Sequence, residues 1–180
     1  MKKKIAILGS TGSIGKSLIK IISKDKNKFK IVLISAKKNY KDLLKQAKFF
    51  NIKNLIISDH NSYKILKKKL YKTNIRVFND YSSLNKIIRK KLDYTMSAIG
   101  GLEGLNPTKQ IIKHTKLIAI ANKESIICGW NLIKKELVKN NTKFIPVDSE
   151  HFSIFRLINK KTKLKINKII ITASGGPFLN

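Results

Sequence analysis

Short apolar runs alternate with amphipathic stretches along the chain. Ile5–Leu8 is a short apolar run, and the following Ser13–Ser23 places apolar residues at a helical spacing. The alternation then predicts strands over Ile31–Ile34, Leu55–Ile57, Tyr94–Ala98, Leu117–Ala121, Phe144–Val147 and Ile169–Thr172, and helices over Tyr40–Phe50, Ser62–Tyr71, Pro107–His114 and Lys123–Lys139. This order favours an α/β fold with a Rossmann-like, doubly wound and mainly parallel sheet.

The composition adds a strong positive charge to this picture. The net charge is +29, yet only three of the 39 basic residues are arginines, and the lysines are spread along the whole chain. Arginine is the usual reader of guanine edges and phosphates. We therefore expect a solvated lysine-rich surface and no specific nucleic-acid partner, although weak, salt-sensitive attraction to polyanions follows from the charge.

Two features bear on the compartment. Cys128 is the single cysteine, which excludes an internal disulfide, and its place in an apolar stretch predicts a buried side chain. The apolar run after the three N-terminal lysines stops at Gly9, which is too short for a signal peptide, and no segment has the length of a membrane span. These features predict a cytoplasmic protein without a membrane partner.

A glycine loop, Gly9-Ser10-Thr11-Gly12-Ser13-Ile14-Gly15, lies between the first strand and the first helix. In that context Gly9 permits a tight turn, Gly12 lets a pyrophosphate approach the backbone, and Gly15 lets the helix pack closely. The helix N-terminus offers N–H groups to phosphates, and Thr11 and Ser13 add hydroxyl donors. The spacing is GxxGxxG, a variant of the common dinucleotide-binding fingerprint.

The residues after the second strand indicate which dinucleotide binds. An NAD site places an acidic residue there for the ribose 2′-hydroxyl. This chain has Lys37, Lys38 and Asn39 instead, which favours NADPH over NADH.

Three polar segments follow predicted strands in the second half. Asp148 and Glu150 fit two hypotheses equally well: ligands for Mg²⁺ or Mn²⁺, or the start of a helix with Asp148 or Ser149 as its N-cap. Asn122, Lys123 and Glu124 follow a strand at the sheet edge where α/β proteins bind ligands, and Asn122 can also cap a helix. Ser174 precedes two glycines in a loop that can bind an anion.

Four separated blocks together resemble the 1-deoxy-D-xylulose 5-phosphate reductoisomerase family. They are GSTGSIG at 9–15, ANKES at 121–125, PVDSEH at 146–151 and SGGPF at 174–178. The resemblance implies an NADP-dependent enzyme of isoprenoid precursor biosynthesis. It would rearrange 1-deoxy-D-xylulose 5-phosphate in the presence of a divalent metal and reduce the product with NADPH to 2-C-methyl-D-erythritol 4-phosphate.

The resemblance also implies roles for individual residues. Thr11, Gly12, Ser13 and Ile14 would hold the pyrophosphate and the nearby ribose, Lys38 and Asn39 the adenosine phosphate, and Asn122 and Glu124 would lie near the nicotinamide. Asp148 and Glu150 would be metal ligands, which favours the metal hypothesis, and Lys123, Ser149, Glu150 and Ser174 would contact the sugar phosphate. Lys123 and Glu150 are the expected catalytic residues.

The resemblance divides the chain into an NADPH-binding domain over 1–146 and the start of an α+β catalytic domain over 147–180. Family members continue well beyond this point and there supply a third metal ligand and a lid, so we expect a truncated chain. The alternative is an NADPH-binding module without turnover of its own. The family usually has glycine at the position of Lys37, and its members are commonly homodimers.

Overall fold

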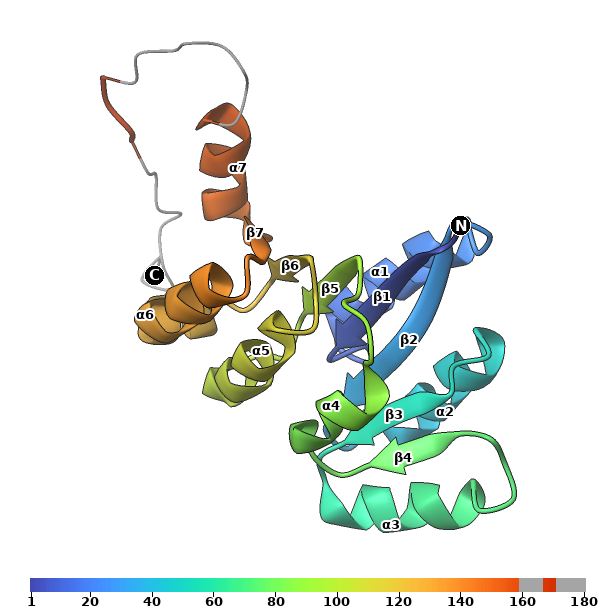
Figure 1. Cartoon of the computed structure of the whole chain (residues 1–180). Coiled ribbons are helices and arrows are strands. Elements are labelled where there is room, and N and C mark those ends of the chain that lie inside the picture. The colour runs from blue at the N-terminus through green and yellow to red at the C-terminus, as the bar shows by residue number, and fades with distance from the viewer. Residues whose placement is uncertain (159–166, 171–180) are drawn as a thin grey trace, which may run out of the picture.

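One seven-stranded sheet forms the centre of the protein (Figure 1). The computed structural model describes residues 1–158 and 167–170. The strands are β1 (Lys3–Leu8), β2 (Phe29–Ala36), β3 (Asn54–Ile57), β4 (Arg76–Phe78), β5 (Tyr94–Ser97), β6 (Leu117–Ile120) and β7 (Lys143–Pro146). They lie in the order β4-β3-β2-β1-β5-β6-β7, and every pair of neighbours is parallel.

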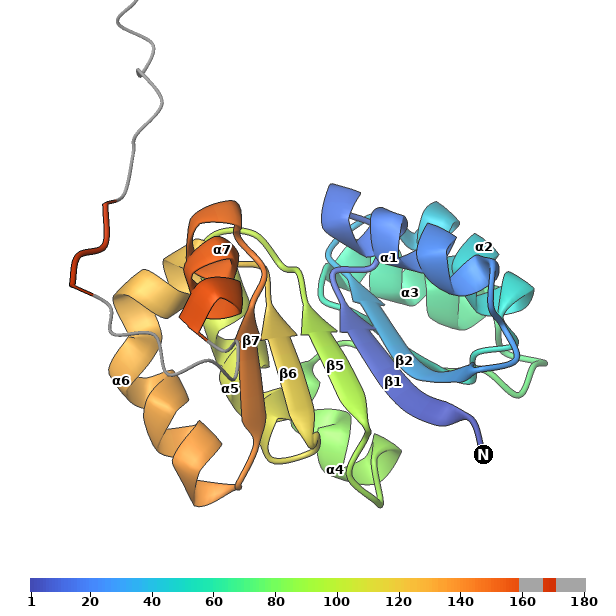
Figure 2. The same cartoon turned by 90° about the horizontal axis from the view of Figure 1, so that it is seen from above.

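Helices cover both faces of this sheet, as Figure 2 shows. They are α1 (Ser13–Ser23), α2 (Tyr40–Phe49), α3 (His60–Lys69), α4 (Leu84–Ile87), α5 (Leu105–Ile112), α6 (Lys123–Lys139) and α7 (Ser149–Ile158), with short 3₁₀ turns η1 (Tyr81–Ser83) and η2 (Leu102–Gly104). Helices α1, α2 and α3 pack against one face, and α4, α5 and α6 pack against the other. The arrangement confirms the Rossmann-like, doubly wound fold predicted from the sequence.

Alternation of side chains along the strands builds two cores. In β1, Ile5 and Ile7 belong to the core under α1, α2 and α3, whereas Ala6 and Leu8 belong to the core under α4, α5 and α6. All four side chains are at most 2% exposed. A central parallel strand is buried on both faces, which is why its sequence is an uninterrupted apolar run.

Most predicted elements are present, and α1 and α6 have the predicted limits. The pattern of apolar residues did not predict β4, α4 or the 3₁₀ turns, all of which are short. Residues 167–170 have no regular secondary structure, so Ile169 and Ile170 are not in the strand predicted for them, and Thr172 lies outside the described residues.

The prediction that Cys128 is buried is wrong, because its side chain is exposed. The buried face of α6 is formed by Ser125, Gly129 and Ile133, which lie four residues apart. Cys128 lies outside that face, as does Ile127, which is 69% exposed. Local apolar character was therefore a poor guide at this position, and the helical period was the better one.

Within 1–158 and 167–170, the helices lack the combination of length and apolar character that crossing a bilayer requires.

The order of the strands fixes where a ligand can bind. The connections run outward from β1 to β4 in one direction and from β5 to β7 in the other, so the chain changes direction between β1 and β5. In open α/β sheets the ligand crevice lies at the carboxyl ends of the strands at this switch point. The glycine loop after β1 lies at that point.

At the opposite end of the same strands, Asp93 joins three segments. Its carboxylate accepts hydrogen bonds from the Lys4 backbone N–H at 2.9 Å and from Lys116 Nζ at 2.8 Å. The Lys116 ammonium, followed by the Lys4 N–H, holds the pKa of Asp93 below its ordinary value.

We predict that Asp93→Asn lowers the free energy of unfolding by about 1 kcal/mol at pH 7, because an amide makes weaker bonds to these donors. A folded-state pKa below the unfolded value gives stability that is present above about pH 4 and is lost as the pH falls further. Urea unfolding followed by circular dichroism at pH 7 and pH 3 should therefore show a smaller difference between the two proteins at pH 3. A difference that does not change with pH would contradict this assignment.

Candidate functional site

The turn between β1 and α1 depends on two glycines. Gly9 has φ +77°, and a Cβ there would lie 2.5 Å from the carbonyl oxygen of Ala98, at the end of β5. A Cβ at Gly15 would lie 2.3 Å from the Gly9 carbonyl oxygen. Real Cβ atoms do not approach a backbone this closely, so both positions require glycine. The predicted roles of Gly9 in the turn and Gly15 in close packing are confirmed.

Polar side chains from other elements hold the turn in place. Ser10 Oγ donates to Gln46 Oε1 at 2.7 Å, and Gln46 Nε2 donates to the Ser10 carbonyl at 2.9 Å. The Gly9 N–H donates to Ser35 Oγ at 3.1 Å, and Tyr81 Oη donates to the same hydroxyl at 2.8 Å. Burial raises the pKa of Tyr81 to about 12, so it remains a donor at neutral pH.

Neither Gln46 nor Tyr81 was predicted from the sequence to be part of the site. Gln46 follows the helical period of the buried residues Leu43 and Ala47 in α2, and a polar residue on that face was a usable signal. Tyr81 gave no such signal, because its partner Ser35 is 46 residues away in sequence.

The start of α1 is open to a ligand. Helices α2, α3, α6 and α7 each begin at a side chain that accepts a first-turn N–H, namely those of Asn39, Asp59, Asn122 and Asp148. Helix α1 begins at Gly12, which has no side chain to do this. The N–H groups of its first turn can therefore bind an anion, which the helix dipole also favours.

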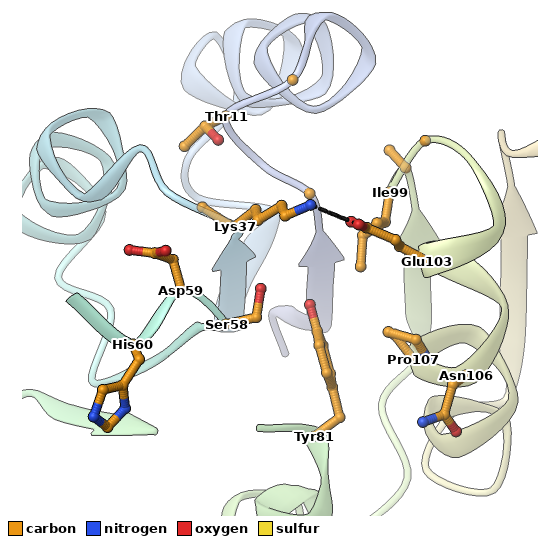
Figure 3. Close-up of a pocket in the computed structure, with 15 residues that line it drawn as sticks. Thr11, Lys37, Ser58, Asp59, His60, Tyr81, Ile99, Glu103, Asn106 and Pro107 are labelled. Carbon is orange, nitrogen blue, oxygen red and sulfur yellow. Dashed lines mark hydrogen bonds and ion pairs between the residues drawn. The ribbon is translucent and has the colours of Figure 1, made fainter. Parts of the chain in front are cut away.

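A cavity of about 760 Å³ lies beside this turn (Figure 3). Its lining comes from the end of β2, from the residues that follow β1, β2, β3 and β5, and from α3, η1, η2 and α5: Gly9, Thr11, Gly12, Ala36, Lys37, Ser58, Asp59, His60, Tyr81, Ala98, Ile99, Gly100, Glu103, Asn106 and Pro107. The volume is within the range of small-molecule and cofactor pockets. Lys37 lines this cavity, and its Nζ lies 2.6 Å from Glu103 Oε1.

The two residues predicted to bind the adenosine phosphate lie next to this cavity without lining it. Lys38 and Asn39 are both exposed. Asn39 is the N-cap of α2 and accepts the Asp42 N–H at 3.0 Å.

A second cavity, of about 430 Å³, continues from the first past the start of α1. The two share Gly12, Ala98, Ile99 and Gly100. Three segments that the sequence singled out meet in the second cavity, since its remaining lining residues are Ser13, Ile14, Ala121, Asn122, Lys123, Glu124 and Asp148. The fold thus brings the glycine loop, the start of α6 and the end of β7 to one place.

Asn122 joins these segments through its side-chain amide. Its Oδ1 accepts the Ser125 N–H at 2.9 Å, which confirms the predicted N-cap of α6. Its Nδ2 donates to the carbonyl oxygens of Ile99 and Gly101 in the loop after β5. Asn122 is 3% exposed, so these bonds are shielded from water.

Asp148 forms the predicted N-cap of α7 and retains one unpaired oxygen. Its Oδ1 accepts the His151 N–H at 2.9 Å and lies 2.6 Å from His151 Nδ1. Its Oδ2 is buried and has no hydrogen-bond partner among the described residues. Burial works against ionisation, but the bonds from His151 outweigh it and lower the pKa of Asp148. A buried, ionised oxygen without a partner fits a cation ligand.

Glu150 is exposed, in the first turn of α7. Its own backbone N–H and the Ser149 hydroxyl, 2.9 Å from Oε2, lower the pKa of Glu150, and the charge of Lys123 acts in the same direction. Among the residues that the structure describes, no three acidic, histidine or cysteine side chains are grouped closely enough to hold a metal. The N-cap and metal hypotheses for Asp148 are compatible, and the second stays a prediction. Ser174 lies outside the described residues.

Gly12, the N-cap of α1, and Gly15, in its first turn, provide a matched pair of variants. A Cβ at Gly12 would meet the Gly9 oxygen at 3.5 Å, an ordinary contact, whereas one at Gly15 would clash. We predict that Gly15→Ala lowers the free energy of unfolding by about 1–3 kcal/mol. Gly12→Ala should leave it within about 0.5 kcal/mol but weaken dinucleotide binding, measured by fluorescence titration. Equal effects of both variants on stability would refute these separate roles.

Asn122→Ala should destabilise the protein because it removes a helix cap and leaves two carbonyl oxygens without their donor. We expect a loss of about 2–3 kcal/mol in urea unfolding. Asn39→Ala removes a cap from an exposed position and should cost about 1 kcal/mol or less. A loss at Asn122 no larger than that at Asn39 would show that the bonds to the β5 loop contribute nothing.

Two family models together match most of the sequence. The model described as 1-deoxy-D-xylulose 5-phosphate reductoisomerase matches residues 5–129. The model of the C-terminal domain of the same enzyme matches residues 144–180.

Curated relatives and solved structures agree with these matches. The chain is 61% identical over 180 residues to the 1-deoxy-D-xylulose 5-phosphate reductoisomerase of Pelagibacter ubique and 42% identical over 179 residues to that of Wolbachia pipientis wMel. These alignments cover 99% of the chain but only 46% and 45% of the relatives, so the chain spans a little under half their length.

Among solved structures, the Zymomonas mobilis enzyme in complex with NADPH matches with a TM-score of 0.79 and 33% identity, over 87% of this chain and 41% of that one. A reductoisomerase in complex with NADPH, fosmidomycin and magnesium matches with a TM-score of 0.78 and 30% identity, over 86% and 38% of the two chains. Sequence, family models and fold all lead to the same group of proteins. The chain belongs to the 1-deoxy-D-xylulose 5-phosphate reductoisomerase family.

Proposed function

We propose that the protein to which this chain belongs converts 1-deoxy-D-xylulose 5-phosphate to 2-C-methyl-D-erythritol 4-phosphate, with NADPH and Mg²⁺ or Mn²⁺, in isoprenoid precursor biosynthesis. The observation that carries the proposal is the second cavity, where the start of α1, the start of α6 and Asp148 meet. A hydride donor held by the first two would lie beside a metal and substrate held by the third. Relatives with 61% identity and structures named for NADPH and magnesium support it.

The cofactor would extend along both cavities. The first-turn N–H groups of α1, with Thr11 and Ser13, would bind the pyrophosphate between them. The adenosine would occupy the larger cavity, with Lys38 and Asn39 at its edge for the 2′-phosphate, and the nicotinamide would lie near Asn122 and Glu124. Because the polar atoms of Asn122 are hydrogen-bonded to Ser125, Ile99 and Gly101, its side chain would form part of the nicotinamide pocket without hydrogen-bonding the cofactor.

The substrate would lie on the other side of the nicotinamide. Asp148 and Glu150 would hold a divalent cation, and Lys123, Ser149 and Ser174 would contact the sugar phosphate. The cation would supply a clamp for the substrate oxygens and stabilise negative charge during the rearrangement. The Lys123 ammonium would add a positive charge beside the same carboxylates.

Three further features are part of the proposal. Residues 1–146 would form the NADPH-binding domain and 147–180 the start of the catalytic domain. The protein would act in the cytoplasm and as a homodimer. The lysine-rich surface would bind no specific nucleic acid.

An NADPH-binding module without turnover is the second candidate for the isolated chain. Within the described residues, Asp148 and Glu150 are the two carboxylates assigned to the metal, and three metal-binding side chains are not found together there. Two carboxylates make a weak Mg²⁺ site unless other groups complete it.

Two measurements separate these functions. We expect the chain to bind NADPH in a fluorescence titration and to consume none when 1-deoxy-D-xylulose 5-phosphate and Mn²⁺ are added. Fusing the chain to the remaining part of the Pelagibacter ubique relative should restore NADPH consumption that depends on both substrate and metal. Asp148→Asn in that fusion should lower turnover at least about 100-fold and leave NADPH affinity unchanged.

Different failures have different meanings. Absence of NADPH binding by the chain would refute the assignment of the crevice. A fusion that binds NADPH but turns over no substrate would leave the binding module as the better description.

A further inference from the structure

An ion pair crosses the larger cavity from one wall to the other. Lys37 is the first residue after β2, and Glu103 lies in η2, in the connection that follows β5. Lys37 Nζ donates to both carboxylate oxygens of Glu103, at 2.6 and 2.8 Å. Figure 3 shows the pair above the cavity, with Tyr81 and Ser58 below it. Since β1 lies between β2 and β5, the pair passes over the carboxyl end of β1, beside the glycine loop.

The position of Lys37 is the one that reads the adenosine ribose in this fold. The residue that follows the second strand contacts the ribose 2′-hydroxyl in NAD sites, and a cation in this region accommodates a 2′-phosphate in NADP sites. Lys37 is the one lysine or arginine among the residues that line the larger cavity. Its ammonium is paired with the Glu103 carboxylate.

Glu103 is the acid in this cavity whose carboxylate is available to Lys37. The other acidic lining residue, Asp59, accepts hydrogen bonds from the Ser62 N–H at 2.8 Å and from Ser62 Oγ at 2.7 Å, and so caps α3. Among the described residues, Glu103 makes no comparable bond to the start of a helix, and its side chain is 64% exposed. It can leave Lys37 for water without loss of a structural contact within the described residues.

We propose that Glu103 is a specificity-determining residue that competes with the cofactor 2′-phosphate for Lys37. This inference rests on the proposed function, because it requires NADPH in the crevice. NADPH replaces the carboxylate with a phosphate, which carries more charge and more acceptor oxygens and therefore forms the stronger pair with an ammonium. NADH has a hydroxyl at the same place and leaves the Lys37–Glu103 pair intact.

The exposure of the pair sets the size of the effect. The Lys37 and Glu103 side chains are 59% and 64% exposed, and exposed pairs of this kind are weak. Removing the competitor should therefore strengthen NADPH binding about two- to fivefold. It should change NADH binding by less than twofold. The ratio of the NADH dissociation constant to the NADPH dissociation constant should therefore rise by the quotient of these two fold-changes.

The test compares dissociation constants for NADPH and NADH in four variants of the chain. Glu103→Gln keeps the size of the side chain and should tighten NADPH binding about two- to fivefold with little change for NADH. Lys37→Ala should weaken NADPH binding about two- to fivefold and selectively. In Lys37→Ala/Glu103→Gln the effect of Glu103→Gln should disappear, because the lysine with which Glu103 pairs is no longer present.

Asp25→Asn is the matched control for the change in net charge. It removes one carboxylate from an exposed pair with Lys28, at 2.5 Å, beyond the end of α1 that is remote from the glycine loop. It should leave both dissociation constants within about 1.5-fold, as expected for a screened charge at a distance.

The outcomes separate this inference from the proposed function. If the unaltered chain does not bind NADPH, the proposed function fails. If the unaltered chain binds NADPH and Glu103→Gln changes the dissociation constants of both cofactors equally, the competition is refuted. It is also refuted if the effect of Glu103→Gln on NADPH binding is the same when Lys37 is absent. Weaker NADPH binding by Glu103→Gln would also refute it, because Glu103 would then position Lys37 for the phosphate. Circular dichroism of each variant verifies that the fold is retained.

Discussion

The close backbone contact between the β1–α1 turn and the end of β5 is the constraint on which the site depends. It requires glycine at two positions. A Cβ at Gly9 would lie 2.5 Å from the Ala98 carbonyl oxygen, and a Cβ at Gly15 would lie 2.3 Å from the Gly9 carbonyl oxygen. Because the turn lies so close to β5, Gly12 and Gly100 line both cavities. The open N-terminus of α1 is thereby placed between the two cavities, where the pyrophosphate of the proposed dinucleotide would link its two halves.

Polar groups around the turn divide into those that hold the fold and those left for a ligand. Gln46, Ser35 and Asn122 have their hydrogen bonds satisfied by neighbouring elements, so they fix the loops rather than contact a ligand through polar atoms. The first-turn N–H groups of α1 and Asp148 Oδ2 lack such partners in the described part of the chain. An unpaired buried atom such as Asp148 Oδ2 is costly, and a ligand that supplies its partner recovers that cost.

Much of the fold could be predicted because its signals are local. The helical period placed α1 and α6 correctly, and apolar runs marked the central strands. Features that depend on distant pairs could not be found in this way. Lys37 and Glu103 are 66 residues apart, and nothing in either local sequence indicates that they meet. The 3-residue strand β4 was not predicted for a related reason, because an edge strand so short forms only by pairing with β3.

The distribution of charge around the crevice differs from that of the whole protein. The net charge is +29, yet the residues that line the two cavities include four of the ten acids, Asp59, Glu103, Glu124 and Asp148, and only two lysines, Lys37 and Lys123. The cationic surface attracts phosphates without selecting among them. Within the described residues, the groups proposed to meet a phosphate in the crevice are the first-turn N–H groups of α1 and the ammonium groups of Lys37 and Lys123, and Lys37 is paired with the Glu103 carboxylate. The four carboxylates would repel an anion that cannot reach these groups, so under the proposed function the crevice, and not the cationic surface, would select among phosphates.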